Sequence, residues 1–351
     1  MGAPVHEHIS DAVKAPDLVR LTPNTLLARF ETLKVYAALG AVRTLLERGT
    51  IRPGGTVIDS SSGIYALALA LACHRYGLHC HIVASTTVDA TMRVQLEILG
   101  ATVDQMPPSH DLRLDQERRV RRVHEILAER PGTHWMRQYH DPVHYAGYQE
   151  FADLVAAALP GQALTVVGAV GTGASTAGLV LPLRRHGLDV RLVGLQPFGS
   201  VTFGSDHLSD PEAIIAGIGS AIPFGNVRHR LYDTLHWIDF RHATAGAVGL
   251  LRDHAVFAGL STGAAYLAAG WEATQHPERT HLVIGPDTGH RYVERAFARH
   301  REMPDARALR PRRVTRLADL APPWSVMAWR GADAPEQARH APHVTVLEDA
   351  P

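Results

Sequence analysis

The stretch ALTVVGAVGTGASTAG (163–178) decides the fold of this chain of 351 residues. Its first half is an apolar run, which is typical of a strand buried on both faces of a parallel sheet. A glycine-rich turn follows and leads into a segment with helical periodicity that ends at Arg185. Gly171 and Gly173 let the backbone approach a ligand closely, and the N–H groups that open the helix attract anions. The stretch therefore predicts a strand, a phosphate-binding turn and a helix.

Two nucleotide-binding motifs are excluded at this turn. No Gly-Lys-Ser or Gly-Lys-Thr sequence follows it, as a P-loop requires, and Thr176 stands where a dinucleotide-binding motif has its third glycine. The hydroxyl groups of Thr172 and Ser175 add donors that suit a phosphate group. The alternative interpretation is a tight strand–helix turn that binds no ligand.

Strand-like and helix-like segments alternate over most of the chain. We expect strands at 55–60, 79–85, 101–106, 163–170, 189–197 and 281–287. We expect helices at 63–77, 87–100, 112–130, 145–159, 242–255, 262–275 and 291–300, besides the one that ends at Arg185. This alternation predicts the α/β class, with mostly parallel sheets that carry helices on both faces.

The length suits either one large α/β enzyme or two domains that share a core. We expect a smaller α/β domain at 35–148, a larger α/β domain formed by 1–34 and 149–301, and a C-terminal extension at 302–351. The extension is rich in Pro, Arg and Ala and lacks sustained periodicity. We expect it to wrap around the body or a partner subunit, or to be partly disordered.

The composition excludes several classes of protein. A formal net charge of +0 gives no electrostatic case for binding nucleic acid or an anionic membrane. No apolar run reaches the roughly 18 residues that a membrane span needs. The N-terminal segment lacks the pattern of a signal peptide. The two cysteines, Cys73 and Cys80, are too few for a disulfide framework, so we expect a cytoplasmic protein.

Lysine is almost absent from this chain. Lysine and arginine together number 35, and only Lys14 and Lys34 are lysines. Lys34 is predicted to lie one or two turns into an Ala-rich, mostly apolar helix. A primary amine forms Schiff bases, which a guanidinium cannot do. Lys34 is therefore a candidate nucleophile, and the alternative is a solvated surface lysine.

Four shorter motifs have weaker signals. DSSSG (59–63) lies at an expected strand-to-helix junction, where it suits a small anion or simply caps the helix. PDTGHRY (286–292) follows a strand, at the sheet edge where α/β proteins bind ligands. RRVRR (118–122) is interpreted as a solvated helix face. His140 and His144 are separated by a proline and lack an evident third ligand, so no metal site is predicted.

In this order and spacing, the motifs resemble those of the fold-type-II pyridoxal-phosphate (PLP) enzymes, the cysteine synthase and cystathionine β-synthase family. The resemblance covers roughly residues 17–300. Lys34 precedes Gly49 at the family's spacing, and the motifs DSSSG, GTGAST and PDTGHRY match its substrate, phosphate and pyridine-nitrogen segments. QYHDP (138–142) and AGLSTGAA (258–265) match two further segments. The resemblance implies a two-domain, tryptophan synthase β-like fold and a homodimer.

The resemblance also implies roles for individual residues. Lys34 would form the Schiff base with PLP and act as the catalytic base. The phosphate group would be held by Gly171, Thr172, Gly173, Ala174 and Ser175, and the pyridine nitrogen by Thr288. The amino-acid substrate would be contacted by Ser61, Ser62, Gly63, Tyr65, Gln138 and Gly217. Ile64 stands where the family has an Asn that hydrogen-bonds the 3′-oxygen of the cofactor, a bond that Ile cannot make.

Within the family, FGSVTFG (198–204), AGIGSAIP (216–223) and VFAGLSTG (256–263) resemble members that serve 2,3-diaminopropionate biosynthesis in siderophore and peptide antibiotic pathways. The resemblance implies β-replacement on O-phospho-L-serine with an amine nucleophile such as L-glutamate. Three alternatives stay open. They are a sulfur nucleophile, as in a cysteine synthase; a dehydratase or racemase reaction without a nucleophile; and a non-catalytic paralogue. The last is suggested by Ile64 and by the loss of the family's Asp and Arg after the lysine.

Overall fold

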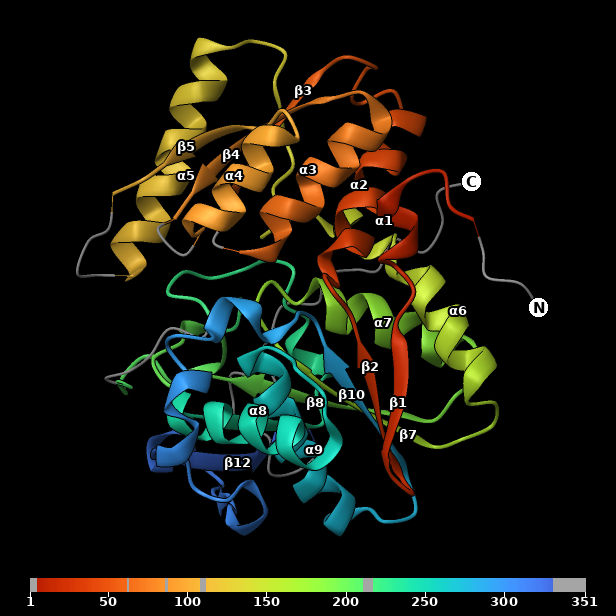
Figure 1. The fold of residues 1–351 in the computed structure, drawn as a ribbon, viewed down its shortest axis with the longest axis vertical. Helices are drawn as coiled ribbons and strands as arrows, with labels where there is room; N and C mark the ends of the chain where they lie inside the picture. Colours follow the sequence, from red (N-terminus) through yellow and green to blue (C-terminus); the bar gives the residue numbers. More distant parts are fainter. Residues whose placement is uncertain (1–4, 62, 86–87, 108–111, 211–216, 331–351) are drawn as a thin grey trace.

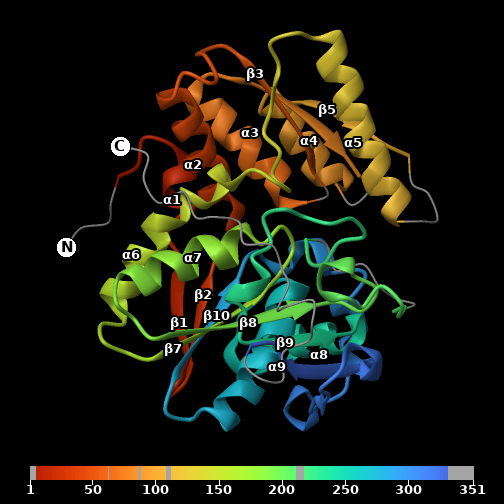
Figure 2. The same ribbon diagram turned by 180° about the vertical axis from the view of Figure 1, so that it is seen from behind.

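The computed structural model describes residues 5–61, 63–85, 88–107, 112–210 and 217–330. The chain forms two α/β lobes, one around a four-stranded sheet and the other around an eight-stranded sheet (Figure 1). Figure 2 shows the same two lobes from behind. Within the described ranges, no helix is long and apolar enough to cross a membrane.

The elements of both lobes are bounded as follows. The larger sheet has the order β1 (Asp17–Thr22), β2 (Thr25–Arg29), β10 (Thr280–Gly285), β7 (Leu164–Ala169), β8 (Val190–Gln196), β9 (Thr234–Ile238), β12 (Trp324–Ala328) and β11 (Arg312–Arg313). The smaller sheet has the order β5 (Thr102–Gln105), β4 (His79–Ala84), β3 (Thr56–Ser61) and β6 (His134–Trp135). The α-helices are α1 (Ile9–Ala12), α2 (Lys34–Glu47), α3 (Ile64–Tyr76), α4 (Ala90–Ile98), α5 (Leu112–Glu129), α6 (Tyr148–Ala158), α7 (Ala174–Arg185), α8 (Phe240–His254) and α9 (Leu260–Gln275).

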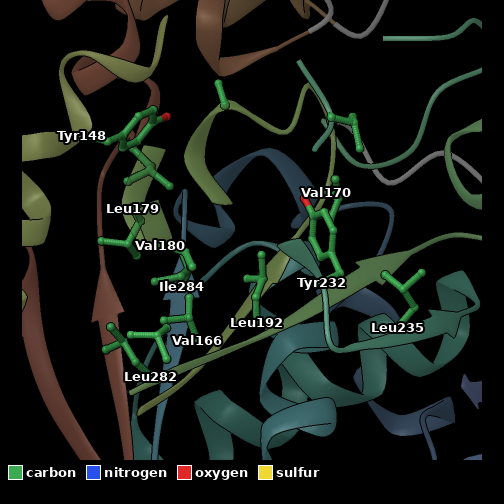
Figure 3. Close-up of a cluster of buried hydrophobic side chains, with 14 of the residues drawn as sticks. Tyr148, Val166, Val170, Leu179, Val180, Leu192, Tyr232, Leu235, Leu282 and Ile284 are labelled. Carbon is green, nitrogen blue, oxygen red and sulfur yellow. The ribbon is translucent and has the colours of Figure 1, made fainter. Parts of the chain in front are cut away.

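Both faces of the larger sheet are covered by helices. Val166 and Leu282 pack in one hydrophobic cluster with α6 and α7, whereas Val167 and Val283 pack in another with α8 and α9. Successive side chains of a strand point to opposite faces, so one apolar run supplies both clusters. Figure 3 shows part of the first cluster, including Tyr148 of α6. The expected α/β class with mostly parallel sheets is confirmed.

Three neighbouring strands of the larger sheet end at the same edge. β2, β10 and β7 are mutually parallel in this order. Each is followed by one of the motifs found in the sequence: Lys34 follows β2, the glycine-rich turn follows β7, and PDTGHRY directly follows β10. Because parallel strands end at one edge, the fold brings these three distant segments together.

Several strands were not expected from the sequence. β1 and β2 form an antiparallel hairpin at one side of the larger sheet. At the other side, β12 pairs antiparallel with β9. β12 belongs to the expected C-terminal extension, which therefore adds to the sheet within its described part, up to Arg330. β2 and β12 are each five residues long, and apolar runs this short do not distinguish a strand from part of a helix.

The expected position of Lys34 inside a helix is wrong. Lys34 is the first residue of α2, not a residue one or two turns into it. The preceding segment instead forms β2, and Thr32 makes an isolated bridge with Asp287. Pairing with β10 thus holds the chain extended until just before Lys34.

The expected helix at 291–300 is also wrong. Two short 3-10 segments, Gly289–Tyr292 and Phe297–Glu302, occupy this region. The rings of His290 and Phe297 both pack against Phe257, at centroid distances of 5.1 and 4.7 Å. A continuous helix would hold these two residues about two turns apart. The backbone leaves the helical region at Ala296, with φ −125° and ψ −62°, so the two segments do not join.

Candidate active site

Lys34 lies beside the segment that follows β10. The N–H of Leu33 donates to the carbonyl oxygen of Pro286 at 2.9 Å. These backbone contacts fix the start of α2, and the Lys34 Nζ donates a hydrogen bond to Thr172 Oγ1 at 3.1 Å. The structure therefore joins the lysine, the glycine-rich turn and PDTGHRY in one site.

The amine of Lys34 is easily deprotonated. Its side chain is partly buried, and loss of solvation lowers its pKa from the ordinary value to about 8. The neutral amine is the nucleophilic form. An ordinary lysine has a pKa of about 10.4, so Lys34 supplies far more neutral amine near physiological pH.

This pKa predicts how fast the protein without cofactor reacts with PLP. The reaction rate should rise with pH and level off above about 8, falling roughly tenfold per pH unit well below that value. Absorbance of the bound cofactor measures the rate. N-acetyl-lysine amide in the same buffers is the control, and its rate should continue to rise towards about pH 10. A protein rate that follows the control would contradict the lowered pKa of Lys34.

The glycine-rich turn has room only for glycine at two positions. A Cβ atom at Gly171 would lie 2.2 Å from the carbonyl oxygen of Gly217. Gly173 has a φ of +81°, and a Cβ there would lie 2.7 Å from the carbonyl oxygen of Asn226. The turn is therefore wedged against the loop at 217–227.

The turn opens directly into α7. Gly173 is the N-terminal cap of this helix, and Ala174 and Ser175 are its first two residues. The N–H groups of a first helical turn have no partner within the helix and carry the positive end of its dipole. Together with the Thr172 hydroxyl, they form a site that suits a phosphate group.

A second cluster lies at the end of β3. The N–H of Gly63 donates to Ser61 Oγ at 3.3 Å, and Ser62 lies outside the described residues. Gln138 is buried, and its Nε2 donates to the carbonyl oxygen of Ser60 at 2.6 Å. The structure thus brings Ser61, Gly63 and Gln138 together.

The cluster at the end of β3, in the smaller lobe, lies close to the PDTGHRY segment of the larger lobe. A Cβ atom at Gly63 would lie 3.1 Å from an Nη atom of Arg291, which belongs to PDTGHRY. Thr288, from the same motif, is partly buried and its Oγ1 lies 2.9 Å from His290 Nδ1. Asp287, which precedes Thr288, is buried; burial raises its pKa to about 6, and the Arg291 charge opposes this rise. The loop after β3 therefore meets the edge that carries Lys34.

Ile64 and Tyr65 open α3 beside this loop. Ile64 is partly buried, whereas Tyr65 is buried and its hydroxyl lies 2.8 Å from His144 Nε2. His144 Nδ1 lies 3.0 Å from the carbonyl oxygen of Asp141, so Nδ1 carries the proton and Tyr65 donates to Nε2. Burial lowers the pKa of His144 to about 4, which keeps the ring neutral. Among the described residues, no group of His, Cys, Asp or Glu could hold a metal ion.

Arg119 is a further candidate site residue, which the sequence interpretation missed. RRVRR (118–122) was expected to be a solvated face, but Arg119 is only 3% exposed and its Nε donates to Ser60 Oγ at 3.2 Å. The same oxygen lies 3.3 Å from the hydroxyl of Tyr139. A signal was present in the helical spacing, because Arg119 precedes the fully buried Val123 by four residues. It therefore lies on the inner face of α5.

The chain belongs to the family of pyridoxal-phosphate dependent enzymes. The family model matches residues 26–287, which include Lys34 and the glycine-rich turn. The chain is 30% identical over 302 residues to an N-(2-amino-2-carboxyethyl)-L-glutamate synthase from Ralstonia nicotianae, covering 80% of this chain and 88% of the relative. This confirms the resemblance found in the motifs.

Solved structures give the same fold. An O-ureido-L-serine synthase superposes with a TM-score of 0.72 at 25% identity, covering 83% of this chain and 94% of that structure. A cysteine synthase from Entamoeba histolytica superposes with a TM-score of 0.75 at 20% identity, covering 87% and 94%. The fold is therefore that of the fold-type-II PLP enzymes.

The residues at the edge of the larger sheet fit PLP. A lysine with a lowered pKa supplies the amine that binds the aldehyde group, and it lies against a helix N-terminus that suits the phosphate. Ile64 is the exception, since its side chain offers no hydrogen bond to the 3′-oxygen. The protein thus has the parts needed to anchor the cofactor at both ends.

Proposed function

We propose that the protein is a β-replacement synthase that acts on an O-activated L-serine, with O-phospho-L-serine favoured, and adds an amine nucleophile such as L-glutamate. The reaction breaks the Cβ–O bond, releases phosphate and forms a Cβ–N bond. A secondary-metabolite or siderophore pathway would use such a product. The relative from Ralstonia nicotianae, named as an N-(2-amino-2-carboxyethyl)-L-glutamate synthase, supports this choice.

The buried guanidinium of Arg119 is the observation that carries the proposal. Its Nε donates to Ser60 Oγ near the end of β3, and no carboxylate of the described residues forms an ion pair with it. A buried charge without a counter-charge is costly, so such a site favours an anionic ligand. A carboxylate of an acidic nucleophile would supply that charge and two oxygens for a bidentate contact, whereas the hydrosulfide ion has no such pair of acceptors.

Each part of the site has a place in this reaction. Bound PLP supplies an electron sink for the breaking Cα–H bond. The Lys34 amine takes the Cα proton, and Thr172 orients that amine. The first turn of α7 holds the phosphate group of the cofactor. Ser61 and Gln138 orient the α-carboxylate of the substrate, and approach of the two lobes excludes water.

The test is a product assay with PLP and O-phospho-L-serine, offering L-glutamate or sulfide as the nucleophile. Mass spectrometry distinguishes the amine adduct from cysteine, and pyruvate reports a dehydratase reaction. We expect the glutamate adduct as the main product. Cysteine as the main product would favour the sulfur-using alternative, and no turnover with bound PLP would favour a non-catalytic role.

Replacing Arg119 tests its part in this function. In Arg119→Ala, the KM for L-glutamate should rise roughly 10- to 100-fold, since a charge-assisted contact contributes about 1.5–3 kcal/mol. Arg121→Ala changes an exposed arginine of the same helix and should leave both KM values unchanged. A rise confined to the KM for O-phospho-L-serine would contradict the assignment of Arg119 to the nucleophile.

A further inference from the structure

We propose that Asp59 is a positioning residue whose negative charge holds the loop after β3 and the Gln138 segment together, and thereby controls binding of the amino-acid substrate. The proposal rests on the proposed function in one respect, namely that these two segments hold the substrate carboxylate. Asp59 is not itself placed in contact with the substrate.

Asp59 is buried at the end of β3, with 1% of its surface exposed. One carboxylate oxygen, Oδ1, accepts hydrogen bonds from the N–H of Ser60 at 2.8 Å and from Trp135 Nε1 at 3.1 Å. The other, Oδ2, accepts from the N–H of Gln138 at 2.9 Å. One side chain therefore links the end of β3 to the Gln138 segment, which lies 79 residues further along the chain.

The Asp59 carboxylate bonds the chain after β6 just beyond the point where backbone pairing between β3 and β6 ends. β6 pairs with β3 at Val57 and Ile58, and the last backbone bond runs from the N–H of Met136 to Ile58 at 3.0 Å. The next link between the two segments is Asp59 to Gln138. Asp59 is the partner of the Gln138 backbone N–H, which has no ladder bond to β3, and it acts beside the bond from Gln138 Nε2 to the carbonyl oxygen of Ser60 at 2.6 Å.

The geometry requires an ionised carboxylate. The three groups that Asp59 contacts are all N–H donors, and an ionised carboxylate is the side chain that accepts at both oxygens without donating. Burial raises the pKa of Asp59 to about 7, and its hydrogen bonds oppose this rise. As the pH falls through about 7, the carboxyl group gains a proton and its hold on one donor is lost.

The groups around Asp59 do not titrate in the same range. Tyr65 from α3 and Cys80 from β4 interact with it electrostatically, and burial raises the pKa of the Tyr65 hydroxyl far above neutrality. The hydrogen bond between Cys80 and Cys73 raises the pKa of Cys80 as well. Arg119 from α5 reaches the neighbouring Ser60, to whose Oγ its Nε donates a hydrogen bond. Asp287 in the PDTGHRY segment also has a raised pKa, of about 6, so the variants of Asp59 and Trp135 are what assign a transition near pH 7 to Asp59.

The experiment measures binding of L-serine to the PLP-loaded protein by the absorbance of the cofactor. L-Serine has no group that titrates between about pH 6 and about pH 8. For the wild type, the dissociation constant should rise as the pH falls through about 7. In Asp59→Asn, one contact becomes donor against donor, so the constant should be about 10-fold higher at pH 8 and the transition should disappear.

A second variant separates positioning from general stability. Trp135→Phe removes one hydrogen bond to Asp59, so its pKa should rise and the transition in L-serine binding should move to higher pH. Glu272→Gln neutralises another buried carboxylate, which bonds His236 in the other lobe, and should leave L-serine binding unchanged. PLP affinity and melting temperature are recorded for each variant as a check on folding.

The outcomes are distinct. A folded Asp59→Asn protein that binds L-serine as tightly as the wild type, or a Trp135→Phe protein with an unmoved transition, overturns the proposal. So does a wild type that binds PLP but not L-serine. If L-serine binding behaves as expected while the glutamate adduct does not form, the proposed function fails and the role of Asp59 stands.

Discussion

Lys34→Ala is expected to lower turnover by about 1,000-fold or more, because one amine both anchors the cofactor and removes the substrate proton. The Lys34 Nζ is the amine that lies against the glycine-rich turn, at 3.1 Å from Thr172 Oγ1. Steady-state kinetics with saturating PLP measures the loss. Since alanine at the first residue of α2 is a good helix former, the variant should fold.

The chain supplies its own control for this prediction, because Lys14 is its only other lysine. Lys14 bonds Glu150 at 2.6 Å and takes no part in the site, so Lys14→Ala should keep full turnover. Borohydride reduction of the PLP-loaded protein should then attach the cofactor to the peptide that contains Lys34. Label on the Lys14 peptide, or turnover retained in Lys34→Ala, would contradict the assignment.

The central strands and the phosphate-binding turn could be predicted because their signals are local. β7, β8 and β10 are short apolar runs, and each is buried on both faces. The turn at Gly171 and Gly173 could be recognised by its glycine-rich composition and by its place between a strand and a helix. Tertiary structure adds the reason for these glycines, which is the close approach of the loop at 217–227.

The start of α2 could not be predicted from local sequence. The segment before Lys34 has apolar residues at spacings that suit a helix or a strand equally. The segment forms a strand because it pairs with β10, which lies more than 250 residues further along the chain; His281, for example, pairs with Thr25. Likewise, nothing near Asp59 in the sequence indicates that Gln138 is its partner.

Arg119 shows a different limit of sequence interpretation. A run such as RRVRR is usually solvated, and the neighbouring Arg121 is indeed exposed. Helical spacing places Arg119 on the same face as Val123 and Ile126, which are buried. The interpretation followed the charge of the run and not its helical periodicity, although the periodicity correctly places Arg119 on the buried face. Buried positions within charged runs are where an unpaired charge most strongly indicates a ligand.

Gly173→Ala is expected to weaken PLP binding by roughly 10- to 100-fold, because the turn must move to make room for a methyl group. The new Cβ would lie 2.7 Å from the carbonyl oxygen of Asn226, and overpacking of this kind costs about 1–3 kcal/mol. The positive φ of +81° adds strain for any residue other than glycine. Moving the turn shifts the first N–H groups of α7 away from the phosphate and disturbs Thr172 beside Lys34.

Gly187→Ala is the control that separates backbone strain from the close contact in Gly173→Ala. Gly187 has a similar φ of +78°, but a Cβ there meets no atom within 4 Å. The two variants therefore share the backbone strain of about 1–2 kcal/mol, and only Gly173→Ala adds the contact with the loop at 217–227. Melting temperature should fall in both, whereas PLP affinity, measured by absorbance titration, should fall in Gly173→Ala alone. Equal PLP affinities in the two variants would mean that the phosphate site tolerates movement of this turn, so its tight packing would serve the fold and not the cofactor.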